Sequence, residues 1–288
     1  MNLRVSLCAL LALAFAAAVS EAQNPRADRR NQPAPAAAAQ PPIHSCDYQF
    51  TVAGTTNNSM LFCVSVNGNV VSFQEPQFYE YIAFGPTIGE GYGICDLTNQ
   101  TAYYDYADGG ASGNWLAPIT VSSTVSAVKI ARTTSDNMFT ITQTFTKLAG
   151  TTPAVKVTMA VKNNTTMPRN IYLLRWADVH PVNAQNTGSY TESFDSSYNS
   201  VWGYTAENYS GPNFYGYGVM LENLGAPNVT TYGQGGTVMT TSSAPATCNP
   251  PSNAGYQASV DGSIMMFYLL EPIGAKKTAT VNVRYIGM

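Results

Sequence analysis

Residues 138–177 read MFTITQTFTKLAGTTPAVKVTMAVKNNTTMPRNIYLLRWA, and this stretch decides the fold class. Segments of alternating apolar and polar residues, rich in Val, Ile, Thr and Phe, are separated by groups of turn residues. Side chains on a strand alternate between the two faces of a sheet, so the pattern predicts strands over 138–147, 154–162 and 170–177. Short connections join antiparallel neighbours, and together with 119–131 these strands predict a four-stranded meander.

Other parts of the chain give the same kind of signal. Asn67-Gly68 predicts a tight hairpin between strands over 60–66 and 69–73, because both turn residues tolerate positive φ. The segments 263–270 and 278–286 predict a closing hairpin. After the first 22 residues no segment keeps an apolar period of 3.6, so very little helix is expected. The predicted fold is all-β, a large antiparallel two-sheet β-sandwich.

The first 22 residues have the pattern of an export signal. Arg4 precedes an apolar run over residues 5–19, and small residues at Ser20 and Ala22 predict cleavage after Ala22. The apolar run is too short to span a bilayer, so no transmembrane segment is expected in the mature chain. Residues 23–42, rich in Pro and Ala, predict a disordered linker, and 43–288 a single β-sandwich domain. The mature protein is therefore expected in the periplasm or outside the cell.

Charge and cysteine content narrow the function classes. The formal net charge is −3 and only 11% of residues are charged, which is a poor match for nucleic acid. Beyond the predicted signal lie Cys46, Cys63, Cys95 and Cys248, an even number that predicts two disulfides in an exported chain. Three pairings are possible, and Cys46–Cys63 with Cys95–Cys248 is preferred.

Segment 174–183, which reads LRWADVHPVN, leaves a predicted strand and enters a loop, where functional side chains are often placed. Asp178, Asn183 and a loop carbonyl offer oxygen ligands for Ca²⁺, the one cofactor that the sequence suggests. A simpler interpretation makes Arg175 a buried ion-pair partner and Asp178 a turn cap. The candidate ligand-binding residues of the segment are Arg175, Trp176, Asp178 and His180.

Aromatic residues gather among Asn, Ser and Gly between positions 190 and 217. Such rings stack on sugars or line protein interfaces, and they also pack long loops onto a sheet. The candidates here are Trp202, Tyr204, Tyr215 and Tyr217. Glu75, Glu80 and Glu90 would suit glycoside chemistry if two of them faced each other, but isolated surface carboxylates are the default interpretation. The glycine-rich segment 89–93 is interpreted as a turn, and no catalytic residue is assigned.

Three phrases look like patterns in uncharacterised exported bacterial β-proteins: 90–95 (EGYGIC), 104–106 (YDY) and 174–179 (LRWADV). The layout of strands over most of 45–288 resembles the supersandwich of galactose mutarotase-like domains. That resemblance implies a supersandwich fold for this part of the chain. Mutarotases rely on histidines and a late glutamate, whereas this chain offers only His44, His180 and a Glu271 that lies next to Pro272, so no catalytic residue is carried over.

Two functional hypotheses follow. The main one is a secreted, non-enzymatic β-sandwich that binds a glycan or an envelope or extracellular protein, or is a structural part of the envelope. The alternative is a carbohydrate-active enzyme with a supersandwich-like core.

Overall fold

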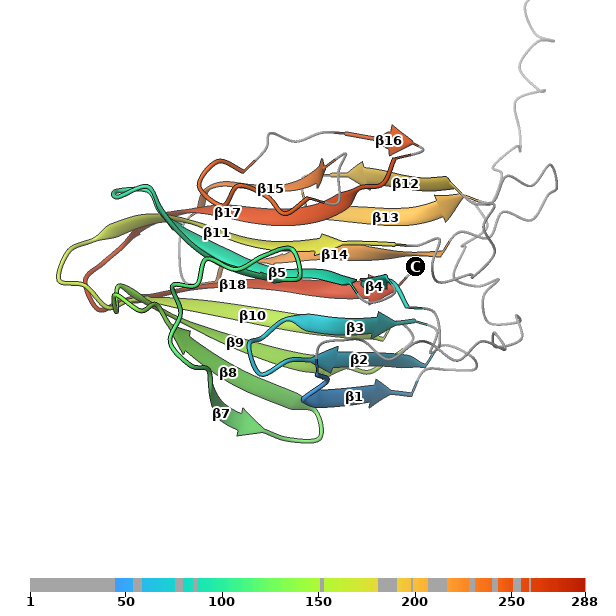
Figure 1. Cartoon of the computed structure of the whole chain (residues 1–288), viewed down its shortest axis with the longest axis horizontal. Helices are drawn as coiled ribbons and strands as arrows, with labels where there is room; N and C mark the ends of the chain where they lie inside the picture. Colours follow the sequence, from blue (N-terminus) through green and yellow to red (C-terminus); the bar gives the residue numbers. More distant parts are fainter. Residues whose placement is uncertain are drawn as a thin grey trace, which may run out of the picture.

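The computed structural model describes an all-β molecule, in which eighteen strands and no helix occur among the described residues (Figure 1). These residues are 45–53, 59–75, 80–84, 87–150, 153–180, 191–197, 199–206, 217–227, 231–239, 243–250, 255–258 and 260–287. The predicted signal and linker therefore lie outside the described residues. No helix in this part of the chain is long and apolar enough to cross a membrane.

The largest sheet has nine strands in the order β16-β12-β13-β14-β18-β10-β9-β8-β7. Its central members alternate buried and partly exposed positions, as the sequence predicted. In that order the strands are Gln257–Ala258, Thr191–Ser196, Ser200–Ala206, Tyr217–Gly225, Thr278–Gly287, Ala154–Asn163, Phe139–Leu148, Ala127–Thr133 and Ile119–Ser123.

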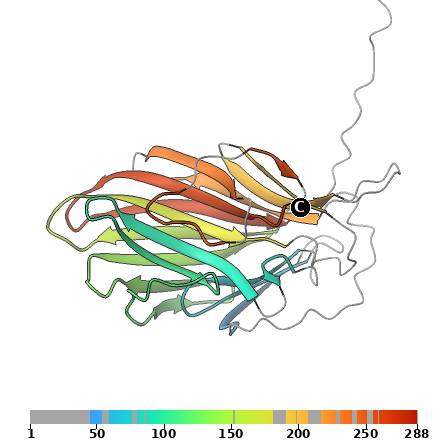
Figure 2. The same cartoon turned by 45° about the horizontal axis from the view of Figure 1, so that its top comes forward.

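The second sheet has six strands, with β15-β17-β11-β5-β4 in order and β6 paired to β5. The path comprises Thr231–Met239, Ser263–Ile273, Arg169–Asp178, Thr87–Asp96 and Ala83–Phe84, and β6 is Thr101–Ala107. A third sheet contains β1 (Tyr48–Val52), β2 (Met60–Val64) and β3 (Val70–Gln74). Both views show β11, β5 and the three-stranded sheet on the same side of the nine-stranded sheet (Figures 1 and 2).

One continuous apolar core lies between the sheets. It takes Val157 and Val161 from β10, Val281 and Val283 from β18, and alternate residues such as Leu173 from β11. Residues 173–178 of β11 are all buried, so both faces of the strand are covered there, as in central strands of covered sheets.

The pairing of strands differs from the prediction at two places, the meander and the closing hairpin. β7, β8, β9 and β10 are consecutive neighbours, but β11 crosses to the six-stranded sheet, where it pairs with β5 and β17. The predicted closing hairpin is also split, because β17 pairs with β11 and β15 whereas β18 pairs with β10 and β14. Alternation specifies which residues face a core, and it does not specify which of two facing sheets a strand joins.

The glycine-rich segment 89–93 lies inside strand β5, and its interpretation as a turn is wrong. A Cβ at Gly89 would lie 2.6 Å from Cβ of Asp178, and one at Gly93 would lie 2.7 Å from Oη of Tyr106. The glycines therefore allow neighbouring chain segments to approach β5 closely.

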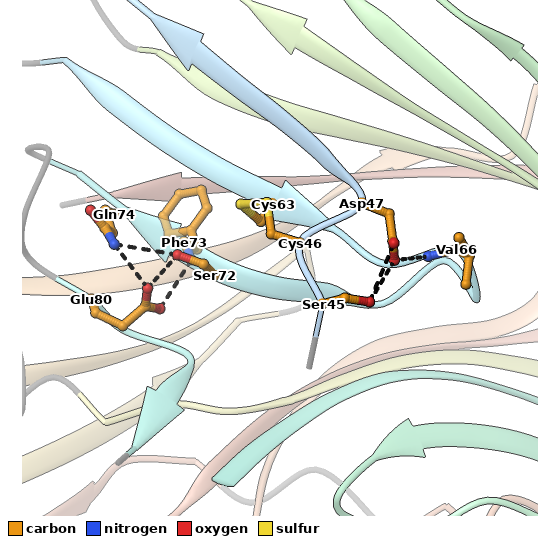
Figure 3. The surroundings of a disulfide bond; sticks show 9 residues. All are labelled: Ser45, Cys46, Asp47, Cys63, Val66, Ser72, Phe73, Gln74 and Glu80. Carbon is orange, nitrogen blue, oxygen red and sulfur yellow. Dashed lines mark hydrogen bonds between the residues drawn. A yellow bond between two sulfur atoms is a disulfide. The ribbon is translucent and has the colours of Figure 1, made fainter. Parts of the chain in front are cut away.

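Both disulfides of the preferred pairing are present. Cys46–Cys63 ties the chain before β1 to β2 (Figure 3). Cys95–Cys248 ties β5 to the segment 243–250, across a sequence separation of 153 residues. These bridges are compatible with a secreted or periplasmic protein.

Candidate functional site

Strand alternation on β11 separates the candidates that the sequence placed together. Arg175 points into the core between the sheets, where its guanidinium lies 2.5 Å from Glu90. Trp176 and Asp178 share the outer side of the six-stranded sheet, where both lie against Gly89. The sequence segment therefore contributes to two different environments.

The inner environment is a fully buried ion pair. Arg175 contacts Glu90, and its Nη1 donates to Oε1 of Gln143 at 2.7 Å. Tyr285 donates to Oε1 of Glu90 at 2.6 Å, and the N–H of Val70 donates to Oε2 at 2.6 Å. Burial by itself lowers the pKa of Arg175, but Glu90 and Tyr285 outweigh burial and hold that pKa above its ordinary value. With no exposed surface, Arg175 fills the structural role that the simpler interpretation gave it.

Trp176 is fully buried and forms the floor of the outer environment. Its Nε1 donates to Oγ of Ser263 at 2.8 Å, and the ring of Tyr106 lies edge-on at 5.5 Å. Leu174 and Met265 complete this second apolar cluster. The hydrogen bond and the packed rings thus hold the indole in a fixed position.

Asp178, His180 and Asp261 come together at the end of β11. Asp178 pairs with Ser263 in the β11–β17 register, which brings Asp261, two positions before Ser263, beside the end of β11. His180 follows Asp178 by two residues, and its backbone N–H donates to the carbonyl of Tyr81 at 2.8 Å. One ligand atom from each of the three side chains lies within 4.8 Å of the others.

The carboxylate of Asp178 is the buried member of this cluster. The residue is 7% exposed, and its Oδ2 lies 3.2 Å from Nε2 of His180. Burial raises the pKa of Asp178, His180 opposes that shift and the nearby charge of Asp261 adds to it. The second oxygen, Oδ1, has no hydrogen-bond donor among the described residues. A buried carboxylate oxygen without a donor lowers the stability of the folded state, so this group is a candidate for binding a ligand.

The three glutamates of the acidic stretch are all buried, so the default interpretation as isolated surface carboxylates is wrong. Glu90 pairs with Arg175, and Glu75 accepts the N–H of Gly287 at 2.8 Å. Glu80 accepts from the side chain of Ser72 and from the backbone N–H of Phe73 (Figure 3). It also accepts from the backbone N–H groups of Tyr81, Ile82 and Ala83. Their hydrogen bonds stabilise the turns and chain ends around β3.

The aromatic candidates lie on the other sheet. Trp202 and Tyr204 are partly exposed residues of β13, on the face opposite Val201, which packs in the core. Burial raises the pKa of Tyr204, and Tyr256 and Asp195 add to the shift. Tyr217 begins β14, and Tyr215 and Asn183 lie outside the described residues. The structure therefore does not bring Trp202 and Tyr204 to the cluster of Asp178 and His180.

Asp261 is the site residue that the sequence analysis missed. It is exposed and follows no motif, and only the antiparallel pairing of β11 with β17 brings it beside Asp178. The sequence predicts the strand over 263–270, which corresponds to β17. It does not predict that this strand pairs with β11.

No protein-family model matches the sequence. No curated protein matches it either. Solved structures do resemble it: a putative aldose 1-epimerase from Escherichia coli K12 is 10% identical with a TM-score of 0.46, covering 84% of this chain and 99% of that one. A galactose mutarotase related enzyme from Lactobacillus acidophilus is 7% identical with a TM-score of 0.44, covering 84% and 97%. A bacterial glucoamylase complexed with acarbose is 10% identical with a TM-score of 0.49, covering 82% of this chain and 33% of that one.

The structural neighbours thus include aldose epimerase and galactose mutarotase related structures at low identity, in agreement with the fold that the resemblance in the sequence implied. The main functional hypothesis of a non-enzymatic binding or envelope domain is corrected here, because each of these three similar structures carries the name of an enzyme. The likeness concerns the fold.

Proposed function

We propose that the chain is an exported carbohydrate-active enzyme whose reacting groups are Asp178 and His180, at the end of β11. One observation carries the proposal: a nine-tenths buried carboxylate lies 3.2 Å from an imidazole whose side chain is 13% exposed. A carboxylate in this position orients the imidazole and stabilises its protonated form. Imidazole titrates near neutral pH and suits proton transfer to and from a sugar hydroxyl.

The surroundings support a fixed geometry for this pair. Trp176 and Asp178 both lie against Gly89, and the backbone N–H of His180 donates to the carbonyl of Tyr81. Asp261, on the exposed side of the cluster, offers a hydrogen-bond acceptor for a hydroxyl of the substrate. Export is supported by the two disulfides and by the predicted signal over residues 1–22.

The test uses the full chain produced with export, so that both disulfides form. Mutarotation of aldoses is followed by proton NMR, and release of reducing ends is measured on a panel of polysaccharides. The names of the similar structures, an aldose 1-epimerase and a glucoamylase, set only the order in which substrates are tried. We expect conversion of at least one substrate.

Asp178→Asn and His180→Gln are each expected to lower the rate about 100-fold or more, which is the usual contribution of general acid–base catalysis. Asp47→Asn is the matched control, because Asp47 is exposed in front of β1. Absence of conversion across the panel, or full activity of both site variants, would refute the proposal.

A further inference from the structure

We propose that Asp178, His180 and Asp261 bind a divalent transition-metal ion, with Zn²⁺ as the representative ion. Each residue offers one ligand atom, and the three atoms lie within 4.8 Å of one another. Two carboxylate oxygens and an imidazole nitrogen form a ligand set that such ions accept. The inference deepens the proposed function, since it concerns the same site, but it stands on the geometry of the cluster and is tested without a sugar.

The spacing of the closest two ligand atoms fits a shared ion. Nε2 of His180 and Oδ2 of Asp178 are 3.2 Å apart. Two ligands that each bind Zn²⁺ at about 2.1 Å in tetrahedral geometry stand about 3.4 Å apart. The pair therefore needs little movement to exchange its hydrogen bond for bonds to one metal ion.

The oxygen without a donor is the second, independent observation. Oδ1 of Asp178 is buried and receives no hydrogen bond from the part of the chain that the structure describes. The fold places this carboxylate in the cluster and brings a second carboxylate, Asp261, close to it. A bound dication neutralises both carboxylates and offsets the cost of burying the first.

The backbone holds the three ligands in position. Asp178 ends β11, Asp261 lies two residues before the paired strand β17, and the backbone N–H of His180 donates to the carbonyl of Tyr81. The imidazole is the feature that selects the ion, because Ca²⁺ and Mg²⁺ prefer oxygen-only sites. The Ca²⁺ site predicted from Asp178 and Asn183 stays a prediction, because Asn183 lies outside the described residues.

An ion at this position would add a specific chemistry to the site. It would polarise a hydroxyl or carbonyl oxygen of a bound sugar, or lower the pKa of a coordinated water. Asp178 and His180 would then act through the ion, and activity would be lost on treatment with EDTA and restored by Zn²⁺.

The experiment measures metal binding directly. The exported protein is stripped with EDTA, dialysed against Zn²⁺, Ca²⁺ or Mg²⁺, and analysed for metal by mass spectrometry and for affinity by titration calorimetry. The chain has two histidines, so the imidazole signals of a proton NMR titration report on His180 against His44. We expect one equivalent of Zn²⁺ and a shift of the His180 signals alone.

Variants assign the site. Asp178→Asn, His180→Gln and Asp261→Asn are each expected to weaken Zn²⁺ binding at least 10-fold. His44→Gln and Asp47→Asn are the matched controls and are expected to bind as the wild type does. Circular dichroism on each variant separates loss of the site from loss of the fold.

Three outcomes would overturn the inference: no stoichiometric Zn²⁺ in the wild type, Zn²⁺ lost with His44→Gln and kept by His180→Gln, or Ca²⁺ bound in preference to Zn²⁺ and kept by His180→Gln. The last would indicate an oxygen-only site. Stoichiometric Zn²⁺ without any sugar conversion would refute the proposed function and leave this inference standing.

Discussion

Arg175 and Asp178 stand three positions apart on β11, and their surroundings are opposite. Arg175 is enclosed with a carboxylate, a tyrosine hydroxyl and an amide around its guanidinium, whereas one oxygen of Asp178 has no donor among the described residues. A fully paired buried charge is typical of a structural group, and an incompletely paired one is typical of a site that meets a ligand. Within the described part of the chain, the inner network has an unpartnered atom of its own, Nε2 of Gln143, but its two charges pair with each other, whereas the unpartnered atom at the end of β11 belongs to the charged group itself.

Arg175→Met is expected to lower the free energy of unfolding by about 3–5 kcal/mol, because it leaves the Glu90 carboxylate buried without its cation. Arg175→Met combined with Glu90→Gln is expected to recover part of that loss. Urea unfolding followed by circular dichroism measures both. Lys129→Met, on an exposed position of β8, is the control and should stay within about 0.5 kcal/mol of the wild type. A double variant no more stable than Arg175→Met would contradict the expectation.

Asp136, in the turn between β8 and β9, gives the protein a pH dependence. Burial raises the pKa of Asp136, but hydrogen bonds from Thr134, Tyr103 and Met138 outweigh burial and hold that pKa below its ordinary value of 3.8. A lowered pKa in the folded state contributes stability above the unfolded value, and this is lost as the pH falls through the folded value. Asp136→Asn should therefore be less stable than the wild type at pH 6.

That difference should shrink as the pH falls below 3.8. Urea unfolding of both proteins from pH 7 to pH 2.5 measures it. Tyr103→Phe removes one of the donors to Asp136 and should weaken the same pH dependence. If the free energy of unfolding of the wild type and of Asp136→Asn changed in parallel with pH, the Asp136 carboxylate would not be the source of the pH dependence.

At the scale of elements, β5 is central to the outer site. Its glycine at position 89 faces both Trp176 and Asp178, and an added Cβ would lie 2.9 Å from the first side chain and 2.6 Å from the second. Gly89→Ala is expected to cost about 1–3 kcal/mol of stability and to alter the near-ultraviolet signal of Trp176. Gly255→Ala is the control, because an added Cβ there meets no atom within 4 Å. Equal effects of the two substitutions would refute the close contact of Gly89 with Trp176 and Asp178.

The same strand shows what the sequence could and could not predict. The segment GEGYG alternates small residues with Glu90 and Tyr92, both fully buried, which is a period of two and the mark of a strand. The interpretation of segment 89–93 as a turn rests on the turn propensity of glycine and does not take this period of two into account. Propensity is a weak guide where close packing selects glycine for its lack of a side chain.

At the scale of the whole molecule, the all-β sandwich was predictable, because alternation over long β-branched segments is a local property of the chain. The assignment of strands to sheets was not, because β11 and β17 pair across a long stretch of sequence. Asp261 reaches the site only through that pairing. Residue types therefore identified Asp178 and His180 as candidates, whereas the complete cluster required the fold.

The disulfide Cys95–Cys248 holds the outer side of the six-stranded sheet together. It fixes the segment 243–250 over the second apolar cluster, where the hydroxyls of Thr247 and Tyr106 lie 2.8 Å apart. Its loop spans 153 residues, against 17 for Cys46–Cys63. In the chain-entropy model the longer loop contributes about 2 kcal/mol more, because it restricts the unfolded chain more.

Replacing Cys95 and Cys248 together by Ala is therefore expected to destabilise the protein by about 5 kcal/mol, and replacing Cys46 and Cys63 by about 3 kcal/mol. Urea unfolding of the two double variants measures the difference. The first variant should also increase quenching of Trp176 fluorescence by acrylamide, since the covering segment is no longer tied to β5. The second should leave quenching unchanged, because its bridge lies in the three-stranded sheet. A reversed order of stabilities would show that strain or residual structure, and not loop length, governs these bridges.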